Sequence, residues 1–354
     1  MTCDSSHVPH PAPAAGTASV PSARPHGNAR VAVVVPAYGV AHLLHEALTS
    51  LQRQTFKQWE CIVIDDGAPD DVASAVAPFL ADPRIRFLAT PNHGVSTARN
   101  TAIAASTAPL VALLDGDDLF RPGYLATVVP ILESDPSVRL VTCNAMIFGA
   151  VTRLRTCVDR PQPMNGTLTQ ILDRTFNVYI GTTFRRADFD AIGGFDTRMA
   201  QSEDFDLWVR LMMLGGTARY IDAVLGEYRV RPGSASANGG RMLLGNIRTY
   251  EKARAALPPG APEILLVDKL LADTRAALDF EHAIDAIVDG DTLRGLASLR
   301  RARGQVGGFL WEASFALWQL FPSLARPMLR WRRRAHTRGS TGPALYPSFL
   351  ETEG

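Results

Sequence analysis

The chain has 354 residues, of which 46% are hydrophobic and 20% charged, and its formal net charge is +1. This length allows one large core or a main domain with an appendage, and the near-zero charge argues against nucleic acid as a partner. The four cysteines form no CxxC pair, so a reduced, cytoplasmic setting is the simplest interpretation.

The first half of the chain predicts an α/β fold. Residues 1–29 are rich in Pro, Ala, Ser and His without an apolar run, which predicts a disordered leader rather than a signal peptide. From residue 30 onward, short apolar runs alternate with amphipathic stretches. Strands are predicted over 31–35, 61–64, 85–88, 110–114 and 138–143, and helices over 42–54, 70–80, 96–105 and 123–133. This order predicts a mainly parallel sheet with helices on both faces.

Polar residues follow the ends of successive predicted strands, namely Tyr38, Asp66, Asn92 and Asp117. Right-handed crossovers place all carboxyl ends of parallel strands at one edge of the sheet, where ligands of open α/β sheets bind. No GxGxxG follows the first strand, which argues against a dinucleotide-binding dehydrogenase. A binding site for another kind of ligand is therefore predicted at this edge.

The run Asp115-Gly116-Asp117-Asp118 directly follows the buried strand predicted over 110–114. Crowded carboxylates repel one another, and a divalent cation such as Mg²⁺ or Mn²⁺ would explain them because such ions prefer oxygen ligands. Asp115 and Asp117 are the metal candidates, since residues two apart in an extended segment point to the same side. A polar turn is the structural alternative.

Three other segments at the same edge have both a binding and a structural interpretation. Tyr38 can stack on a base or ribose, or pack in the core. Asp65 and Asp66 can accept hydrogen bonds from a nucleoside, or form an Asx turn with the following glycine. Arg99, on the helix after Asn92, can meet a diphosphate through charge-assisted hydrogen bonds, or lie on the surface.

The regular alternation of short apolar runs and amphipathic stretches ends in the second half of the chain. We expect an irregular, acceptor-side loop over 150–175, a strand over 178–184, a helix over 204–214, one or two strands over 220–230, and helices beyond 238 with breaks near 258–259 and 304–308. Ser202 is placed to cap the helix that begins near Asp204. Glu203 and Asp204 are either part of that helix start or carboxylates placed for general base catalysis.

Together these segments resemble the family-2 glycosyltransferases, which are inverting nucleotide-sugar enzymes of the GT-A fold. The resemblance spans about residues 30–233 and rests on segments that match in order and spacing: 33–38 (VVVPAY), 51–56, 63–67 (VIDDG), 92–100, 115–118 (DGDD) with Pro122, 193–196 (GGFD), 202–208 (SEDFDLW) and 228–234. Gly39 stands where the family often has Asn, and Arg231 where a His is frequent.

The resemblance implies roles for individual residues of this chain. It implies a Rossmann-like GT-A domain over 30–235 and a donor that is a nucleoside-diphosphate sugar, with uridine favoured. The nucleotide contacts implied are Pro36, Tyr38, Asp65, Asp66, Asn92, Arg99 and Asp115, with Arg231 as a cationic diphosphate contact. Asp117 becomes the direct metal ligand with Asp115 beside it, and Asp204 the base with Glu203 shaping its site. A hexosyl group would pass with inversion to a saccharide or lipid-linked acceptor in cell-envelope polysaccharide synthesis.

The C-terminal third predicts a helical extension over 236–335 and a flexible tail over 336–354. Residues 309–321 form an aromatic, apolar run that is too short to span a bilayer. The run is followed by the basic residues 330–334, and such a pairing suits an anionic membrane surface. A helix packed on the catalytic domain with a solvated basic tail is the alternative. We expect a cytoplasmic protein with peripheral membrane contact through 309–334.

Two other kinds of protein share parts of this pattern. A phosphatase or phosphotransferase with an Asp nucleophile is similar in its strand-end DxD, but that nucleophile usually follows the first strand, whereas three βα units precede Asp115 here. A non-catalytic nucleotide-sugar-binding scaffold is the third interpretation. The presence of both Asp117 and Asp204 argues against the scaffold.

Overall fold

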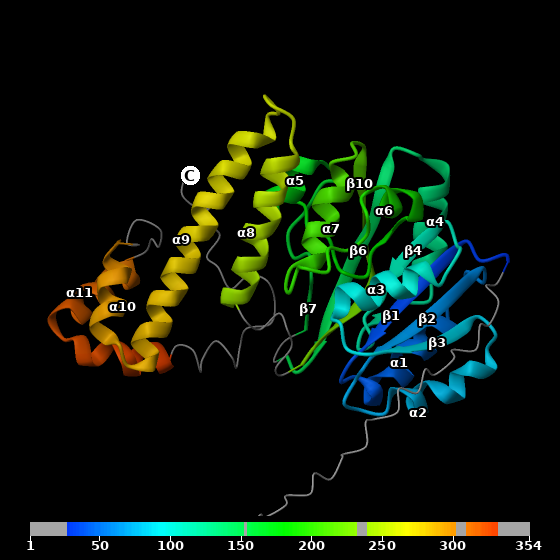
Figure 1. Cartoon of the computed structure of the whole chain (residues 1–354), viewed down its shortest axis with the longest axis horizontal. Helices are drawn as coiled ribbons and strands as arrows, with labels where there is room; N and C mark the ends of the chain where they lie inside the picture. The colour runs from blue at the N-terminus through cyan, green and yellow to red at the C-terminus, as the bar shows by residue number, and fades with distance from the viewer. Residues whose placement is uncertain (1–26, 152–153, 232–238, 302–308, 332–354) are drawn as a thin grey trace, which may run out of the picture.

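The computed structural model describes residues 27–151, 154–231, 239–301 and 309–331. The expected leader lies outside the described residues apart from 27–29, and so do the tail over 336–354 and the break near 304–308. Figure 1 shows an α/β body from which the long helix α9 (Glu263–Asp289) extends to carry the last helices.

The first four strands of the sheet pair in parallel, in the order β3-β2-β1-β4. They are β1 (Val31–Ala37), β2 (Trp59–Asp66), β3 (Ile85–Thr90) and β4 (Leu110–Leu113). Successive side chains of β1 enter two different cores, because Val31 and Val33 pack on one face of the sheet and Ala32 and Val34 on the other. The continuous apolar runs of the sequence therefore arise because helices cover both faces.

The sheet is mainly parallel, as expected, but short antiparallel strands join it beyond β4. The three-residue strand β9 (Thr183–Arg185) lies antiparallel between β4 and β6 (Val138–Gly149). β10 (Thr217–Val230) pairs in parallel with β6 and antiparallel with β5 (Leu119–Phe120). Apolar runs encode burial but not strand direction, so the sequence did not reveal the inserted β9.

Helices cover both faces of the sheet, as expected. In chain order they are α1 (Ala41–Gln52), α2 (Val72–Val76) continued by the 3-10 helix η1 (Ala77–Ala81), α3 (Val95–Ala104), α4 (Tyr124–Ser134), α5 (Leu168–Leu172), α6 (Arg186–Ala191) and α7 (Glu203–Met212). The region 150–175 is more ordered than expected, since it also contains the short strands β7 (Arg155–Thr156) and β8 (Asn165–Gly166). A capping box between Thr167 and Gln170 begins α5 and was readable in the sequence.

The chain beyond the sheet is helical, as expected, and its first part joins the main core. Helix α8 (Gly239–Ala256) ends before the predicted break at 258–259, and its Tyr250 packs in the same core as Trp208 of α7. Beyond α9 lie α10 (Thr292–Arg301), α11 (Phe309–Leu320) and the 3-10 helix η4 (Pro322–Leu324), which share a separate small core with the end of α9. Among the described helices, none combines the length and the apolar character that a membrane span requires.

Candidate active site

The loop after β1 leaves Tyr38 free at the carboxyl edge of the sheet. Its side chain is 54% exposed, so the core-packing alternative is wrong, while Pro36 is half-buried at the strand end. The loop is held by Asp70, whose carboxylate accepts from the backbone N–H of Gly39 at 3.0 Å and of Ala41 at 2.6 Å. Asp70 therefore caps α1 from a different loop. Sequence reasoning missed it because the N-cap residue itself is Val40, which has no side-chain acceptor.

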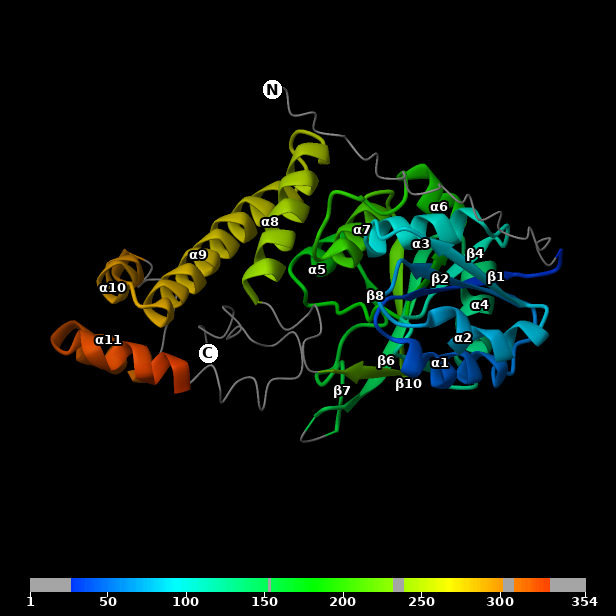
Figure 2. The same ribbon diagram turned by 60° about the horizontal axis from the view of Figure 1, so that its bottom comes forward.

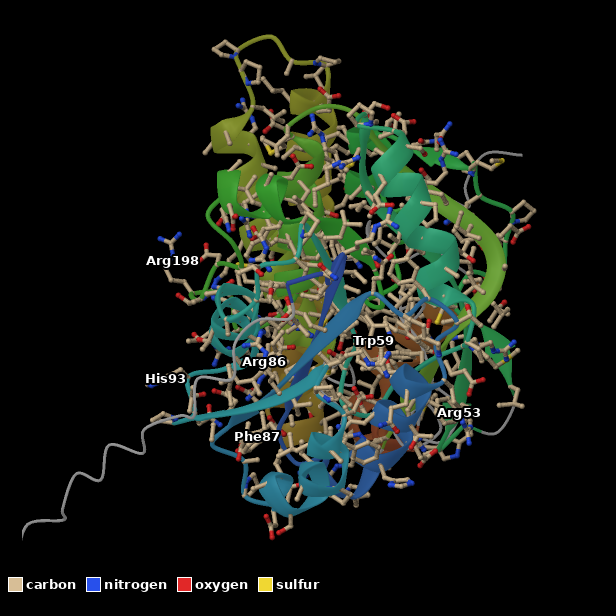
Figure 3. All side chains as sticks on the ribbon, turned by 90° about the vertical axis from the view of Figure 1, so that its right-hand side faces the viewer. Arg53, Trp59, Arg86, Phe87, His93 and Arg198 are labelled. Atoms are coloured by element: carbon tan, nitrogen blue, oxygen red, sulfur yellow. The ribbon has the colours of Figure 1, made fainter. Side chains whose placement is uncertain are left out.

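The loops after β2 and β3 are locked together at the same edge. Asp66 is 5% exposed and accepts from the backbone N–H of His93 at 3.0 Å, next to the exposed Asn92. Asp65 accepts from the N–H of Ala68, three residues further on, at 2.8 Å, so its carboxylate holds the turn after β2. Figure 3 shows the side chain of His93 projecting from the same side of the molecule as that of Arg198.

Gly67 is the point of closest approach between these loops, and its replacement should disturb both. Its φ is +64°, and a Cβ there would lie 2.6 Å from the backbone nitrogen of Asn92. We expect Gly67→Ala to lower the free energy of unfolding by about 1–3 kcal/mol, measured by denaturant unfolding. Gly123→Ala is the control, because a Cβ at that turn meets no atom within 4 Å. Equal losses in both variants would contradict a special role for Gly67.

The carboxylates of the Asp115–Asp118 run face different partners. Asp117 accepts from Arg231 Nε at 2.6 Å, and Asp118 is buried, where it accepts from the backbone N–H of Arg229 at 2.8 Å and from Tyr179 Oη at 3.3 Å. Burial and the charge of Asp115 raise the pKa of Asp117 even though Arg231 opposes the shift. Burial and both neighbouring carboxylates raise the pKa of Asp118 as well. The site thus concentrates more negative charge than its arginines neutralise.

The residues of this run would fit a hard divalent cation if other ligands completed its coordination. The described residues contain no group of three or more His, Cys, Asp or Glu side chains that could hold a metal by themselves. Mg²⁺, however, commonly takes one or two carboxylates together with waters and substrate phosphates. Asp115 is 29% and Asp117 16% exposed, so both remain open to such an ion. A cation there would also relieve the repulsion that raises the pKa of Asp117.

Arg99 of α3 joins this run to the second acidic cluster. Its guanidinium is 4% exposed and donates from Nη2 to Asp115 Oδ1 at 2.8 Å and from Nη1 to Glu203 Oε1 at 2.9 Å. The surface alternative for Arg99 is therefore wrong. Burial alone would lower the pKa of Arg99, but the carboxylates of Asp115 and Glu203 outweigh it and raise that pKa. Arg99 is therefore a buried cation that links Asp115 to Glu203.

The start of α7 presents Glu203 and Asp204 without the expected cap. Ser202 lies in the left-handed region at φ 57°, and its side chain makes no capping bond to the helix. Its Oγ instead donates to the carbonyl of Met242 in α8 at 3.4 Å. α8 can approach so closely because residue 245 is glycine, where a Cβ would lie 2.5 Å from the carbonyl oxygen of Gln201. A strained non-glycine residue held by packing is typical of functional sites.

The environment of Asp204 suits a general base. Burial and the adjacent charge of Glu203 raise the pKa of Asp204 to about 6, against the opposing effects of its hydrogen bond from the Phe205 N–H at 2.7 Å and of the nearby Arg99 and Arg174. A base is most effective when its pKa lies near the working pH. The pattern of the sequence left capping and catalysis open for this residue, and the raised pKa favours catalysis.

Asp206, only two residues further along α7, has a structural environment instead. It is 1% exposed and pairs with Arg210 of the same helix at 2.7 Å and with Lys252 of α8 at 2.5 Å. Lys252 also contacts Asp196 in the loop before α7 at 2.8 Å. This cluster fixes α7 against α8 and therefore sets the position of Asp204.

Two further residues that sequence reasoning missed hold loops around the site. Asn100 donates to the carbonyl of Phe195 and accepts from its N–H, both at 2.9 Å, and so clamps the loop before α7 to α3. Arg174 lies over the ring of Phe205 at 4.3 Å and donates to Asn246 Oδ1 at 2.7 Å. Asn100 lies beside Arg99 in the segment 92–100 that resembles the family, and this resemblance was the only indication of its role in the sequence. Nothing in the sequence indicated the role of Arg174.

A cavity of about 460 Å³ opens beside the Asp115–Asp118 run. Its lining comes from the start of α1, the end of β6 and the end of β10, and consists of His42, Leu43, Gly149, Ala150, Arg229, Val230 and Arg231. Arg231 lines this cavity and also contacts Asp117, so the cavity borders the strand-end site. Two arginines on its wall suit an anionic or polyhydroxylated ligand.

The order of the sheet and the acidic residues at its carboxyl edge agree with a glycosyltransferase of the GT-A type, and comparison with known proteins gives the same class. The model of the glycosyl transferase family 2 matches residues 32–193. An uncharacterised protein of Mycobacterium tuberculosis is 30% identical over 57% of this chain and 67% of its own length. The chain belongs to glycosyl transferase family 2.

A named relative and two solved structures resemble the chain. The UDP-Glc:alpha-D-GlcNAc-diphosphoundecaprenol beta-1,3-glucosyltransferase WfgD of Escherichia coli is 25% identical over 59% of this chain and 80% of its own. The mannosyltransferase PcManGT of Pyrobaculum calidifontis, in complex with GDP-Man and Mn²⁺, has a TM-score of 0.58 at 22% identity over 90% of this chain and 89% of its own. S. aureus TarS 1-349, in complex with UDP-GlcNAc, has a TM-score of 0.58 at 17% identity, over 87% and 88%.

The match to some relatives is partial. The chain spans 35% of an uncharacterised glycosyltransferase of Rickettsia conorii, to which it is 26% identical over 55% of its own length. The solved structures, at these identities, establish the GT-A fold.

Proposed function

We propose that the protein transfers a hexosyl group, with inversion, from a nucleoside-diphosphate sugar to a hydroxyl of a saccharide or lipid-linked acceptor. The observation that carries this proposal is the position of Asp204, whose raised pKa suits a base and whose neighbour Glu203 is tied through Arg99 to Asp115. A uridine nucleotide is the favoured donor, in line with the donors named for WfgD and TarS. The name of WfgD supports a lipid-linked acceptor.

The proposed reaction is a single in-line displacement. Asp204 takes the proton of the acceptor hydroxyl as that oxygen attacks C1 of the donor sugar. The new C1–O bond forms on the face opposite the diphosphate, and the bond from C1 to the diphosphate oxygen breaks with its electron pair on the leaving group. Inversion at C1 follows from this geometry, as in inverting glycosidases, whose water attacks from the face opposite the leaving group.

The donor is proposed to lie along the strand-end edge. Tyr38 would stack on the nucleoside, and Asp66 and Asn92 would bind its polar groups, with Pro36 and Asp65 shaping the two loops. Arg231 would contact the diphosphate. A bound Mg²⁺ or Mn²⁺, held by Asp117 with Asp115 beside it, would stabilise the negative charge of the leaving diphosphate.

We propose residues 30–235 as the catalytic domain and 236–335 as its helical extension. The core shared by α7 and α8 supports a role for the first helix of the extension in positioning Asp204. The proposal includes a cytoplasmic protein in cell-envelope polysaccharide synthesis, with peripheral membrane contact through the extension.

Calorimetric titration with UDP, GDP and dTDP, each with Mn²⁺ or with EDTA, tests the donor class. We expect one nucleotide to bind, and to bind more tightly with Mn²⁺. The matching sugar nucleotides should then release nucleoside diphosphate, while small phosphate esters release no phosphate. Phosphate release would favour the phosphotransferase alternative, and nucleotide binding without turnover on any acceptor would favour a scaffold.

Arg99 and Glu203 should shift the pH profile of turnover in opposite directions. Arg99 lowers and Glu203 raises the pKa of Asp204. Because the base must be unprotonated, the acid limb of kcat/KM should move to higher pH in Arg99→Met and to lower pH in Glu203→Gln. Shifts in the same direction, or none in either variant, would contradict Asp204 as the titrating base.

A further inference from the structure

The segment from α11 through residue 331 carries an apolar face that the described residues leave uncovered. One side of the segment packs on α9 and α10 through Phe315, Trp318, Ala325 and Leu329. The other side, which we call the α11 apolar face, consists of Leu317, Leu320, Phe321, Leu324, Met328 and Trp331. These residues recur at helical spacings of three and four, so they follow the period of the segment itself.

The exposure of this face is large for a protein in water. Leu320 is 75%, Phe321 56% and Trp331 73% exposed. Figures 1 and 2 agree that α10 and α11 lie at the far end of α9, away from the sheet. No described element of the α/β body therefore covers the face. Contiguous exposed apolar residues of this kind mark an interaction surface.

The sequence of this segment and of the residues after it is basic, and this charge selects the occupant. Glu312 is the last acidic residue before Glu351, and between them lie Arg326, Arg330, Arg332, Arg333, Arg334 and Arg338. Arg326 and Arg330 donate to the carbonyl of Val288 at 3.1 and 3.2 Å, which places both guanidinium groups at the end of α9 beside the face. A surface that combines aliphatic side chains, exposed aromatic residues and the guanidinium groups of Arg326 and Arg330 complements anionic lipid headgroups over acyl chains.

We propose that the α11 apolar face docks on an anionic lipid bilayer. Leu320, Phe321 and Trp331 would enter the boundary between headgroups and acyl chains, while the arginines contact the lipid phosphates. The segment would lie in the interface, since Pro322 interrupts it and no described helix can span a bilayer. This docking does not depend on the reaction proposed above.

Vesicle binding of the full chain tests the docking. The protein should co-sediment with vesicles of phosphatidylcholine mixed with phosphatidylglycerol, more weakly with phosphatidylcholine alone, and more weakly in high salt. The double variant Leu320→Glu/Phe321→Glu should lower the partition coefficient by about tenfold or more, because binding scales with buried apolar area. Absence of binding to the mixed vesicles, or equal binding to both vesicle types, would overturn the proposal.

Leu265→Glu is the matched control, because Leu265 is 80% exposed on the first turn of the same α9 that carries the face at its other end. It should bind vesicles like the unaltered protein, and an equal loss in this control would overturn the assignment to α11. Far-UV circular dichroism and the thermal unfolding of all these variants should match those of the unaltered protein, which shows that their helices are folded. Light scattering tests whether a second copy of the chain occupies the face instead. If the unaltered protein is a dimer that Leu320→Glu/Phe321→Glu dissociates, and if it does not bind vesicles, the face is a dimer interface and the lipid proposal is wrong.

Discussion

Asp204→Asn should lower turnover by about 10²- to 10⁴-fold, the usual contribution of a general base. Asparagine has the shape of the aspartate but cannot accept the acceptor's proton. Nucleotide affinity should remain, because Asp204 lies on α7 and the proposed nucleotide contacts lie on the strand-end loops. The measurement is single-turnover release of nucleoside diphosphate with saturating donor and acceptor. Turnover within a few-fold of the unaltered protein would remove Asp204 from the role.

The same variant should not lose stability. Burial and Glu203 hold the pKa of Asp204 at about 6, above its ordinary value, so the ionised form is disfavoured in the folded state. Between the ordinary pKa and about 6 the folded protein binds more protons than the unfolded chain, and stability falls as pH rises through that window. Asp204→Asn removes this cost, so its Tm near neutral pH should equal or exceed that of the unaltered protein.

The pH dependence of the unaltered protein follows from the same pKa. kcat/KM should fall as pH decreases through about 6, because protonated Asp204 cannot act as a base. An acid limb near pH 4 would indicate a solvent-exposed carboxylate as the base instead.

Asp206→Asn is the matched control for Asp204→Asn, on the same helix and with the same chemical change. It weakens the pairing with Arg210 and Lys252. We expect a loss of on the order of 1–3 kcal/mol in the free energy of unfolding, with turnover at low temperature reduced far less than in Asp204→Asn. Comparison of the two variants therefore distinguishes a loss of catalysis from a loss of packing on the same turn of helix.

Asp117→Ala should abolish the metal dependence of nucleotide binding. In the unaltered protein, Mn²⁺ should tighten binding of the preferred nucleotide, because one or two carboxylates and the diphosphate together hold such an ion. Without Asp117 only Asp115 remains, and it is already paired with Arg99. Titration of the variant should therefore give the same weak affinity with Mn²⁺ and with EDTA.

Asp65→Asn serves as the control at the same edge of the sheet. Its carboxylate accepts from the N–H of Ala68, so the variant should keep the response to Mn²⁺ whatever its absolute affinity. If Asp117→Ala keeps the full response to Mn²⁺, the metal lies elsewhere. If nucleotide binding does not respond to metal even in the unaltered protein, Arg231, which contacts Asp117 at 2.6 Å, would be the cation that neutralises the diphosphate.

The parallel strands and their helices followed from local patterns. Continuous apolar runs such as 31–35 arise only where both faces of a strand are covered, and their alternation with amphipathic stretches predicted the order of elements. The direction of the later strands was harder to predict from the sequence. β9 has three residues, too few to show a period, and its antiparallel insertion next to β4 depends on which chain segment reaches that gap.

Some residues of the candidate site could likewise be predicted from the sequence, and others could not. Asp66 and Asp117 were predicted together because strand ends of a parallel sheet meet at one edge, a rule that needs no knowledge of side-chain contacts. The cap of α1 by Asp70 and the unusual backbone of Ser202 gave no such signal. Each depends on a neighbour that is distant in the sequence, such as Gly245, which lets α8 approach.

The sequence by itself determined the family resemblance, the order of the first βα units and the candidates at the strand ends, because these depend on burial and spacing along one segment. Only the tertiary structure decided that Arg99 joins Asp115 to Glu203, that burial raises the pKa of Asp204 to about 6, and that Asp206 is committed to packing. The physical reason is that charge–charge interactions act through space. Residues 99 and 203 become partners only when α3 and α7 are brought to the same edge of the sheet.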